Sequence, residues 1–384
     1  MATTGKGSHW APEWKTFKDP ASGAMIHQLT NYKCLSNHLY FTESGWYDGD
    51  RKLIIISDRE NRTNLFGIDL ESGEITQLTD LDPEKGRIGA VSKSPVREEA
   101  YFYHGDTLMV LDLRSLQICP LYTRPKGYTV GQTNATADGR YICTYHSQDL
   151  SNRFRIDLGH GYVGFREIFE AHPHSMIVKV DIDSGKSEVV FEENHWITHV
   201  NTSPKLPHIL TFCHEGPWNL VEQRIWGLDI NTGKSWKIRP QIPEEAIGHE
   251  YWMIDGEHIG YHGYTPKRPV YGAIRYDNTD QVEAPLTYSS THFHSRMLDL
   301  IVGDGSRTDP YVLLWRYRNG QFEGPKVLAQ HRGSFHIQRV HVHPRFSPDG
   351  KQVLYTADPQ GYGQVFLADV PDFDSLPDRS SLPS

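Results

Sequence analysis

The sequence is poor in cysteine, in long apolar runs and in positive charge. Its four cysteines, at positions 34, 119, 143 and 213, form no Cys-x-x-Cys pair, which argues against a disulfide framework or a zinc knuckle and favours a reducing compartment. No segment reaches the ~18 apolar residues of a membrane span, and the N-terminus lacks an apolar signal segment. The net charge of −9 argues against a nucleic-acid partner, because such partners require basic patches. We therefore expect a cytoplasmic protein that binds neither nucleic acid nor membrane.

Amphipathic helices are also scarce. The one candidate, residues 164–176, lies in a non-repeating insertion at about 146–175, which we expect to be a loop or a short helix. Turn-forming residues are abundant instead, with 33 Gly and 23 Pro among 384 residues. A two-domain α/β chain would need several amphipathic helices, so the sequence argues against it and favours short strands joined by turns.

Two sequence phrases recur along the chain. The first, a strand ending in Asp followed by a polar Gly turn and another strand, occurs at 53–80, 176–192, 224–240 and 353–370. The second, a polar Gly turn leading into an apolar strand, occurs at 41–53, 135–142 and 346–353. Units of four antiparallel strands recurring at roughly 40 to 50 residues are typical of β-propeller blades. The sequence predicts an all-β, seven-bladed β-propeller, with blades that start near residues 36, 88, 130, 196, 247, 291 and 336.

The two ends of the chain indicate how the ring closes. The last blade stops without an outer strand, whereas residues 22–32 resemble the outer-strand segment 72–80. We predict that a strand at about 24–30 completes the last blade and removes an exposed edge. Residues 1–384 would then form a single propeller domain.

Polar residues cluster on the predicted first strands, which line the central channel of a propeller. A core strand would carry aliphatic residues there, so these positions predict a metal or catalytic site, although any one histidine could be structural. They are Asn37, His38, Asn134, His199, His249, Glu250, His292, His294, Gln338, His341 and His343.

The densest group lies in the segment HIQRVHVHPRFSPDG, residues 336–350, which alternates and therefore predicts a β-strand. In such a strand His341 and His343 share one face, and Gln338 joins them only if the strand bends or the ligands gather at its end. Two imidazoles and an amide oxygen suit a borderline-to-hard divalent cation. Buried structural histidines are the alternative interpretation.

Several segments together give the sequence its resemblance to a known family. With residues 36–80 they are CHEGPWNLVEQRIW, GHEYW, THFHS and the Gln-x-x-His-x-His-Pro run. On these motifs the chain resembles the oligogalacturonate lyases, polysaccharide lyases with a seven-bladed propeller and a divalent metal, usually manganese. The resemblance covers most of the chain. It implies that Mn²⁺, or another divalent cation, binds to His292, Gln338, His341 and His343; the neighbouring His294 departs from the family pattern. It also implies His249 as the catalytic base and Arg224 as an arginine beside the reacting sugar.

The implied reaction is β-elimination from short oligogalacturonides, digalacturonate or unsaturated digalacturonate, to a 4-deoxy-5-keto uronate in pectin catabolism. The partner would be an anionic uronate oligosaccharide. The cation would stabilise charge on the substrate carboxylate, neutral His249 would take the α proton, and Arg224 would offset the remaining charge. Water, Tyr251 or the base itself could protonate the leaving oxygen. The alternatives are a propeller lyase for another uronate-containing oligosaccharide and a non-catalytic propeller that binds or scaffolds proteins. The sequence leaves the oligomeric state open.

Overall fold

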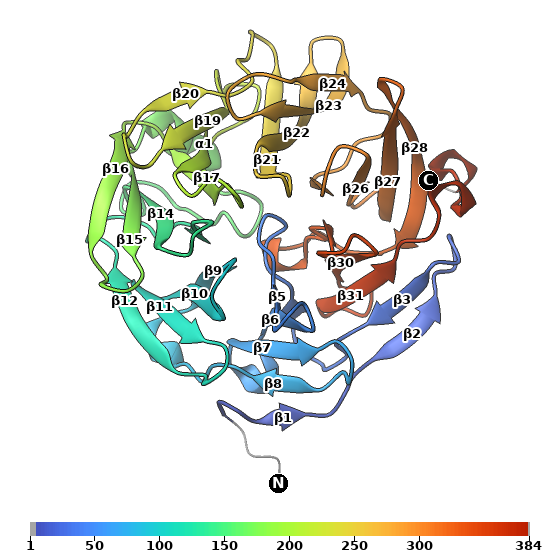
Figure 1. Cartoon of the computed structure of the whole chain (residues 1–384), viewed down its shortest axis with the longest axis horizontal. Coiled ribbons are helices and arrows are strands. Elements are labelled where there is room, and N and C mark those ends of the chain that lie inside the picture. Colours follow the sequence, from blue (N-terminus) through green and yellow to red (C-terminus); the bar gives the residue numbers. More distant parts are fainter. Residues whose placement is uncertain (1–4, 383–384) are drawn as a thin grey trace. The chain divides into compact units, whose positions relative to one another are not determined.

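The computed structural model describes residues 5–382. Strands β1 to β31 form seven sheets in this part of the chain, each with four to six strands (Figure 1). These sheets are the seven blades of an all-β propeller, the fold class that the repeats predict. Six of the seven predicted starting positions lie within four residues of the first strand of a sheet.

The chain divides into two compact units, one of residues 84–283 and one that combines the residues up to Pro83 with those from Ala284 onward. We call them the middle unit and the terminal unit. A single domain spanning the whole chain stays a prediction.

The middle unit contains four four-stranded sheets, apart from the last two residues of β24, and consecutive strands are neighbours in each. Their strands are β9 (Ile88–Lys93), β10 (Glu99–His104), β11 (Thr107–Asp112) and β12 (Ile118–Thr123); β13 (Thr133–Ala135), β14 (Tyr141–Ser147), β15 (Ser175–Asp181) and β16 (Ser187–Glu193); β17 (Ile197–Thr202), β18 (Ile209–His214), β19 (Ile225–Asp229) and β20 (Ser235–Lys237); and β21 (Ala246–Trp252), β22 (His258–Thr265), β23 (Arg268–Arg275) and β24 (Val282–Pro285).

The terminal unit contains the other three sheets. Their strand orders are β1-β8-β7-β6-β4, with β5 also on β6, then β25-β26-β27-β28, and β2-β3-β31-β30-β29. The strands are β1 (His9–Trp10), β2 (Lys15–Lys18), β3 (Met25–Gln28), β4 (Ser36–Asn37), β5 (Trp46–Tyr47), β6 (Lys52–Ser57), β7 (Asn64–Asp69), β8 (Ile75–Gln77), β25 (Phe293–Ser295), β26 (Leu300–Gly303), β27 (Tyr311–Arg318), β28 (Gln321–Gln330), β29 (Arg345–Phe346), β30 (Gln352–Ala357) and β31 (Gln364–Asp369).

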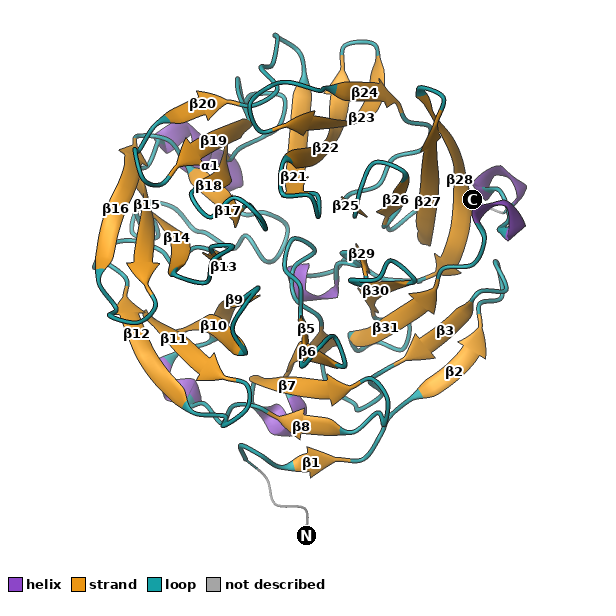
Figure 2. Ribbon diagram, in the orientation of Figure 1, coloured by secondary structure: helices purple, strands orange, loops and turns teal. Residues whose placement is uncertain are grey.

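Among residues 5–382, helices are few and short (Figure 2). They are α1 (Phe165–Ala171) and the 3₁₀ turns η1 (Arg59–Asn61), η2 (Pro83–Lys85), η3 (Gln338–Val340), η4 (Phe373–Ser375) and η5 (Arg379–Ser381). The segment expected to be a loop or short helix holds α1, which packs Ile168 against Leu150 and Trp196. Within residues 5–382, no helix has the length and apolarity needed to cross a bilayer.

The last sheet is completed by the N-terminal strand predicted from the repeat. Strand β3 pairs antiparallel with β31, with Ile26 opposite Ala368 and Gln28 opposite Phe366. Ile26 is fully buried in the apolar cluster that contains Val353 and Phe366. The sequence did not predict β2, which lies outside β3, or β1, which lies outside β8.

The recurring Asp-Gly phrase has a direct local cause. The Oδ1 atom of Asp69 accepts hydrogen bonds from the backbone N–H groups of Glu71 and Ser72, both at 3.0 Å. Asp229 accepts from Asn231 and Thr232 in the same way. An Asp side chain that accepts from backbone N–H groups two or three residues further on fixes a tight turn. These two turns join β7 to β8 and β19 to β20, whereas the copy at 353–370 joins β30 to β31, the second and third strands of its sheet.

The predicted strand through residues 336–343 is wrong. Residues Gln338–Val340 form η3, closed by a 3.2 Å hydrogen bond from His341 N–H to the Gln338 carbonyl. His343 has a left-handed φ of 44°, which extended backbone cannot contain, and the strand is reduced to β29. His341 and His343, which the alternating pattern assigned to a strand, therefore lie on an irregular loop.

Candidate functional site

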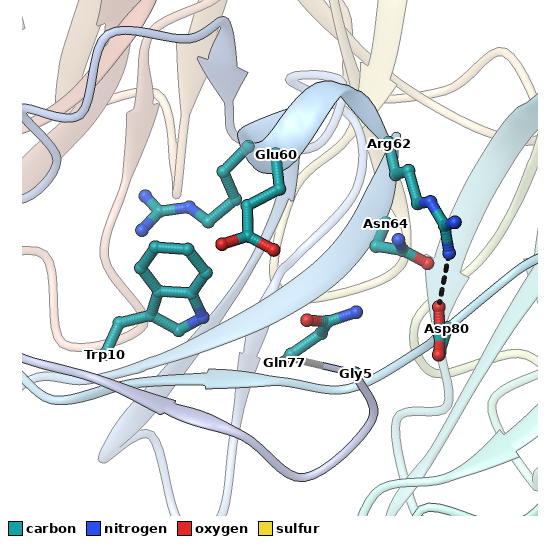
Figure 3. Close-up of a pocket in the computed structure, with 8 residues that line it drawn as sticks. Gly5, Trp10, Glu60, Arg62, Asn64, Gln77 and Asp80 are labelled. Carbon is teal, nitrogen blue, oxygen red and sulfur yellow. Dashed lines mark ion pairs between the residues drawn. The ribbon is translucent and has the colours of Figure 1, made fainter. Parts of the chain in front are cut away.

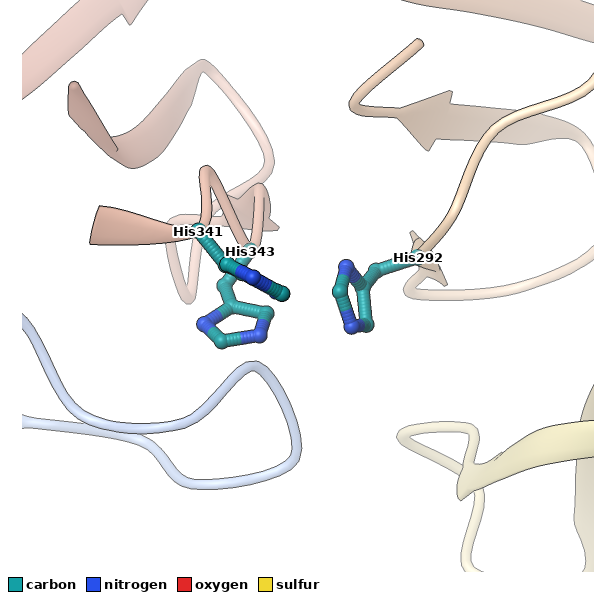
Figure 4. A group of neighbouring side chains, drawn as sticks. All are labelled: His292, His341 and His343. Carbon is teal, nitrogen blue, oxygen red and sulfur yellow. The ribbon is translucent and has the colours of Figure 1, made fainter. Parts of the chain in front are cut away.

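Three predicted metal-binding histidines meet in the terminal unit (Figure 4). The ring centroid of His292 lies 4.2 Å from that of His343 and 5.7 Å from that of His341. One nitrogen from each ring lies within 4.8 Å of the others, and the residues are 3%, 8% and 7% exposed for His292, His341 and His343. The rings converge from two separate segments. We call them the three-histidine group.

A buried carboxylate orients His292. Asp304, which follows β26 and is fully buried, accepts a 2.7 Å hydrogen bond from His292 Nδ1. The other carboxylate oxygen accepts from the backbone N–H groups of Thr291 and His292, each at 2.8 Å. Because Nδ1 carries the hydrogen, Nε2 is the ring nitrogen of His292 whose lone pair can bind a cation. A carboxylate behind a ligating imidazole is the usual arrangement at protein metal sites.

His341 is also suited to a cation. Its Nδ1 atom is buried and has no hydrogen-bond partner among the described residues. Burial lowers its pKa to about 4, with a further contribution from His292, so at neutral pH the ring has the uncharged form that binds metals. Phe335, Tyr40 and Phe41 pack around the group and limit its hydration. The residues therefore fit a divalent cation.

Other predicted residues of this unit have different neighbours. His294 Nδ1 accepts a 3.2 Å hydrogen bond from Phe346 N–H, and His294 is not part of the three-histidine group. Asn37 accepts from Arg339 Nε at 3.0 Å. Gln338 begins the turn before His341, and its role as a ligand stays a prediction.

His38 is held by two polar contacts. Its Nδ1 lies 2.6 Å from Thr356 Oγ1, and its Nε2 lies 2.8 Å from the carbonyl oxygen of His343. Burial lowers the pKa of His38 to about 4, so the ring is neutral. Both ring nitrogens are therefore engaged by the protein.

The predicted base lies in the middle unit, on a bulge of β21. Between Gly248 and Tyr251 the register with β22 shifts, and His249 has a φ of 49°. His199 has the same φ on the corresponding bulge of β17. A non-glycine residue in this conformation is strained and is concentrated at functional sites. The bulge turns both imidazoles away from the alternation of their strands.

His262 and Trp218 are among the side chains that contact His249. Its Nδ1 lies 3.4 Å from His262 Nε2, and the Trp218 ring packs edge-on with its centroid 5.0 Å away. His262 is buried, whereas His249 is partly exposed. One imidazole of the pair must donate to the other, so the tautomer of His249 is coupled to that of His262.

Arg224 lies at the centre of a buried ion-pair network. It is 1% exposed, and it donates from Nη1 to Glu215 at 2.5 Å and from Nε to Glu250 at 3.5 Å. Burial alone would raise the pKa of Glu215, but Arg224 and His199 lower it below its usual range. Two of the five guanidinium N–H groups of Arg224 thus donate to Glu215 and Glu250, and a contact with substrate would have to use the other three.

A second cluster of metal-ligand types belongs to this network. His199, Cys213 and Glu215 offer atoms within 4.8 Å of one another. However, Glu215 already accepts from Arg224 and Thr198, and burial raises the pKa of the Cys213 thiol well above its usual value. A cation there would face the guanidinium, so these residues do not fit a metal. Nearby, Asn134 accepts from the backbone N–H of Thr202 at 3.2 Å.

A polar pocket of about 290 Å³ lies elsewhere in the terminal unit, between β1, β8 and η1 (Figure 3). Glu60, Trp10 and Gln77 line it. Of its two arginines, Arg59 pairs with Glu13 at 2.8 Å and Arg62 lies 3.7 Å from Asp80. With both cations already paired, the pocket is poorly suited to a uronate carboxylate.

Sequence reasoning missed the residues that support the predicted ones. These are Asp304 behind His292, Thr356 behind His38, His262 beside His249, and Glu215 beside Arg224. Glu215 lies in the conspicuous CHEGPWN segment and could have been singled out there. Thr356 and His262 lie on ordinary strands and Asp304 directly follows one, so none of the three carries a local signal.

Comparisons with known proteins agree with one another. The family model described as oligogalacturonate lyase matches residues 4–374. The chain is 26% identical over 395 residues to an oligogalacturonide lyase of Pectobacterium atrosepticum, covering 96% of this chain and 98% of that protein. It is 25% identical over 396 residues to an oligogalacturonate lyase of Dickeya dadantii, with the same coverage. A solved structure of an oligogalacturonate lyase in complex with manganese has a TM-score of 0.87 at 25% identity, covering 96% of this chain and 99% of that one.

Proposed function

Because the chain belongs to the oligogalacturonate lyase family, we propose that it cleaves short oligogalacturonides, digalacturonate or unsaturated digalacturonate, by metal-dependent β-elimination. The product would be a 4-deoxy-5-keto uronate, formed in pectin catabolism. The observation that best supports this proposal is the three-histidine group, which gives the chain a place for a divalent cation. Family membership also weighs against the non-catalytic scaffold.

We propose that His292, His341 and His343 hold the cation, with the amide oxygen of Gln338 as a fourth ligand. Three imidazoles and an amide oxygen suit borderline divalent metals, and the structural relative bound to manganese favours Mn²⁺. When bound, such a cation supplies Lewis-acid stabilisation of the charge that develops on a substrate carboxylate as the α proton leaves. Asp304 keeps His292 in the tautomer that can bind it.

We propose His249 as the general base. To accept the α proton at Nε2, its Nδ1 must carry hydrogen and donate to Nε2 of His262, 3.4 Å away. His262 then acts as the acceptor that fixes this tautomer. Arg224 remains the predicted arginine of the reaction, through the N–H groups that Glu215 and Glu250 leave.

The structure narrows the choice of proton donor to the leaving oxygen. Tyr251 is 2% exposed, and its hydroxyl contacts that of Tyr271 inside the sheet. A buried hydroxyl with an internal partner is poorly placed to protonate a substrate. Water and protonated His249 are the remaining candidates from the sequence.

Metal removal and restoration test the proposal. The purified protein is expected to bind about one Mn²⁺ ion, and EDTA treatment is expected to abolish the release of a thiobarbiturate-reactive product from digalacturonate until Mn²⁺ is restored. A panel that includes glucuronate-containing oligosaccharides separates the proposed substrate from other uronates. Full activity after complete metal removal, or no activity on any galacturonide, would contradict the proposal.

We also propose that the protein works in the cytoplasm. All four of its cysteines are free, and Cys119 is exposed. An exposed free thiol is best maintained in a reducing compartment. Fractionation of the producing cell, with the protein followed by antibody, tests this assignment, and recovery outside the cytoplasm would refute it.

A further inference from the structure

We propose that His38 is a positioning residue, which holds the backbone of His343 so that the His343 imidazole can meet His292 and His341. The inference rests on the proposed function, in which the three-histidine group binds a divalent cation. It concerns a residue outside that group. The sequence alone placed His38 among the polar residues of the channel, without a role of its own.

The hydrogen bonds of His38 define its tautomer. A carbonyl oxygen can only accept, so Nε2 must carry hydrogen and donate to the His343 carbonyl at 2.8 Å. The backbone N–H of His38 donates to Thr356 Oγ1 at 3.3 Å. The Thr356 hydroxyl is therefore free to donate its own hydrogen to His38 Nδ1 at 2.6 Å. Every polar atom of the ring has a partner, and none is left to bind a cation.

The same threonine also fixes the preceding residue of the loop. The Thr356 backbone N–H donates to the Val342 carbonyl at 3.1 Å. Two successive carbonyls, those of Val342 and His343, are thus held from β30, one directly and one through His38. This pins the peptide planes on both sides of the His343 side chain.

The loop needs such support because its backbone is strained. His343 has a φ of 44°, and a non-glycine residue in the left-handed region costs roughly 1–2 kcal/mol. Without a partner for its carbonyl, the segment can relax toward the extended backbone that its sequence favours. The His343 ring would then turn away from His292, whose ring centroid lies 4.2 Å from it.

Three substitutions distinguish a positioning role of His38 from a role in core packing alone. In His38→Gln the amide nitrogen lies near the position of Nε2 and can still donate to the His343 carbonyl. In His38→Asn the shorter amide reaches only toward Thr356, and His38→Leu removes both contacts. His146→Leu is the matched control, because His146 is also fully buried and its Nδ1 lies 2.8 Å from the Thr129 carbonyl, in a sheet of the middle unit.

The measurement is Mn²⁺ affinity, obtained by titrating each purified protein while free Mn²⁺ is followed by electron paramagnetic resonance. Thermal unfolding of each metal-free protein is recorded in parallel. We expect His38→Gln to bind close to wild type, and His38→Asn and His38→Leu to bind about 10-fold to 100-fold more weakly, the usual loss when a second-layer partner is removed. His146→Leu is expected to lose thermal stability and keep its affinity.

The proposal is overturned if folded His38→Leu binds as wild type does, if His146→Leu weakens binding as much, or if wild type binds no Mn²⁺. A wild-type protein that binds Mn²⁺ but cleaves no galacturonide would refute the proposed function alone. The affinity ranking of the variants would still decide the role of His38.

Discussion

Asp304→Asn is the substitution that most directly tests how the three-histidine group works. The asparagine Oδ1 can still accept from the backbone N–H groups of Thr291 and His292, as one carboxylate oxygen does now at 2.8 Å. Its NH₂ group, however, faces His292 Nδ1, where the carboxylate accepts at 2.7 Å. Two donors cannot face each other, so the imidazole must move its hydrogen to Nε2. The lone pair that would bind the cation is then lost.

The size of the effect follows from that loss. Second-layer partners typically contribute 10-fold to 100-fold to metal affinity, and here the change also removes the ligand's lone pair. We therefore expect a loss of about 100-fold, which corresponds to about 2.7 kcal/mol. The fold should persist, because the backbone contacts of Asp304 are kept.

Mn²⁺ titration near neutral pH measures the metal affinity, and thermal unfolding recorded in parallel measures the stability of the fold. Asp19→Asn is a suitable control, because Asp19 is buried in the same unit and accepts from the backbone N–H groups of Ala21 and Ser22. It should retain wild-type affinity. If Asp304→Asn also retains it, then His292 does not bind through Nε2 and the tautomer argument is wrong.

Three further predictions concern other residues. His249→Ala should lower kcat on digalacturonate by about 10²-fold to 10⁴-fold with unchanged Mn²⁺ affinity, and near-normal turnover would exclude it as the base. His294→Asn, which can still accept from its backbone partner, should keep Mn²⁺ affinity, whereas His292→Asn should lose it; the reverse result would exchange their roles. Glu215→Gln should cost about 3–5 kcal/mol by unpairing buried Arg224. Because the folded pKa of Glu215 lies below its usual 4.5, denaturant titrations should show this difference in full above that pH and diminishing as the pH falls below it.

The fold could be predicted because the hydrogen bonds of a tight turn are made by residues that are close together in the sequence. An Asp such as Asp69 or Asp229 followed by a polar Gly turn determines its own hydrogen bonds, so the repeat could be read without tertiary contacts. The completing strand β3 followed from the same phrase. Strand β1 extends a sheet that has five other strands and β2 one that has four, and the repeat predicts neither of them.

The candidate site was harder to predict because it depends on backbone conformations that cannot be inferred from the residue types. Histidine adopts a left-handed φ more often than most residues, but nothing in the sequence marks His199, His249 and His343 as the ones that have it. The parity argument for the 338–343 segment assumed an extended strand and therefore failed. Asp304 is a single acidic residue after a strand, and only the folded chain shows that it contacts His292.

The pairing of β3 with β31 can form only after almost the whole chain has been synthesised. His27 and Asp369, which lie 3.3 Å apart in the finished sheet, are separated by 342 residues. At about 5–20 residues per second, a ribosome needs roughly 20 to 70 s to make the chain between them. Throughout that interval β3 has no β31 to pair with, and unpaired strand edges are prone to aggregate. The nascent chain must therefore keep its first strands from the wrong partner until its last strand emerges, and the sheet that carries His343 is among the last parts to be completed.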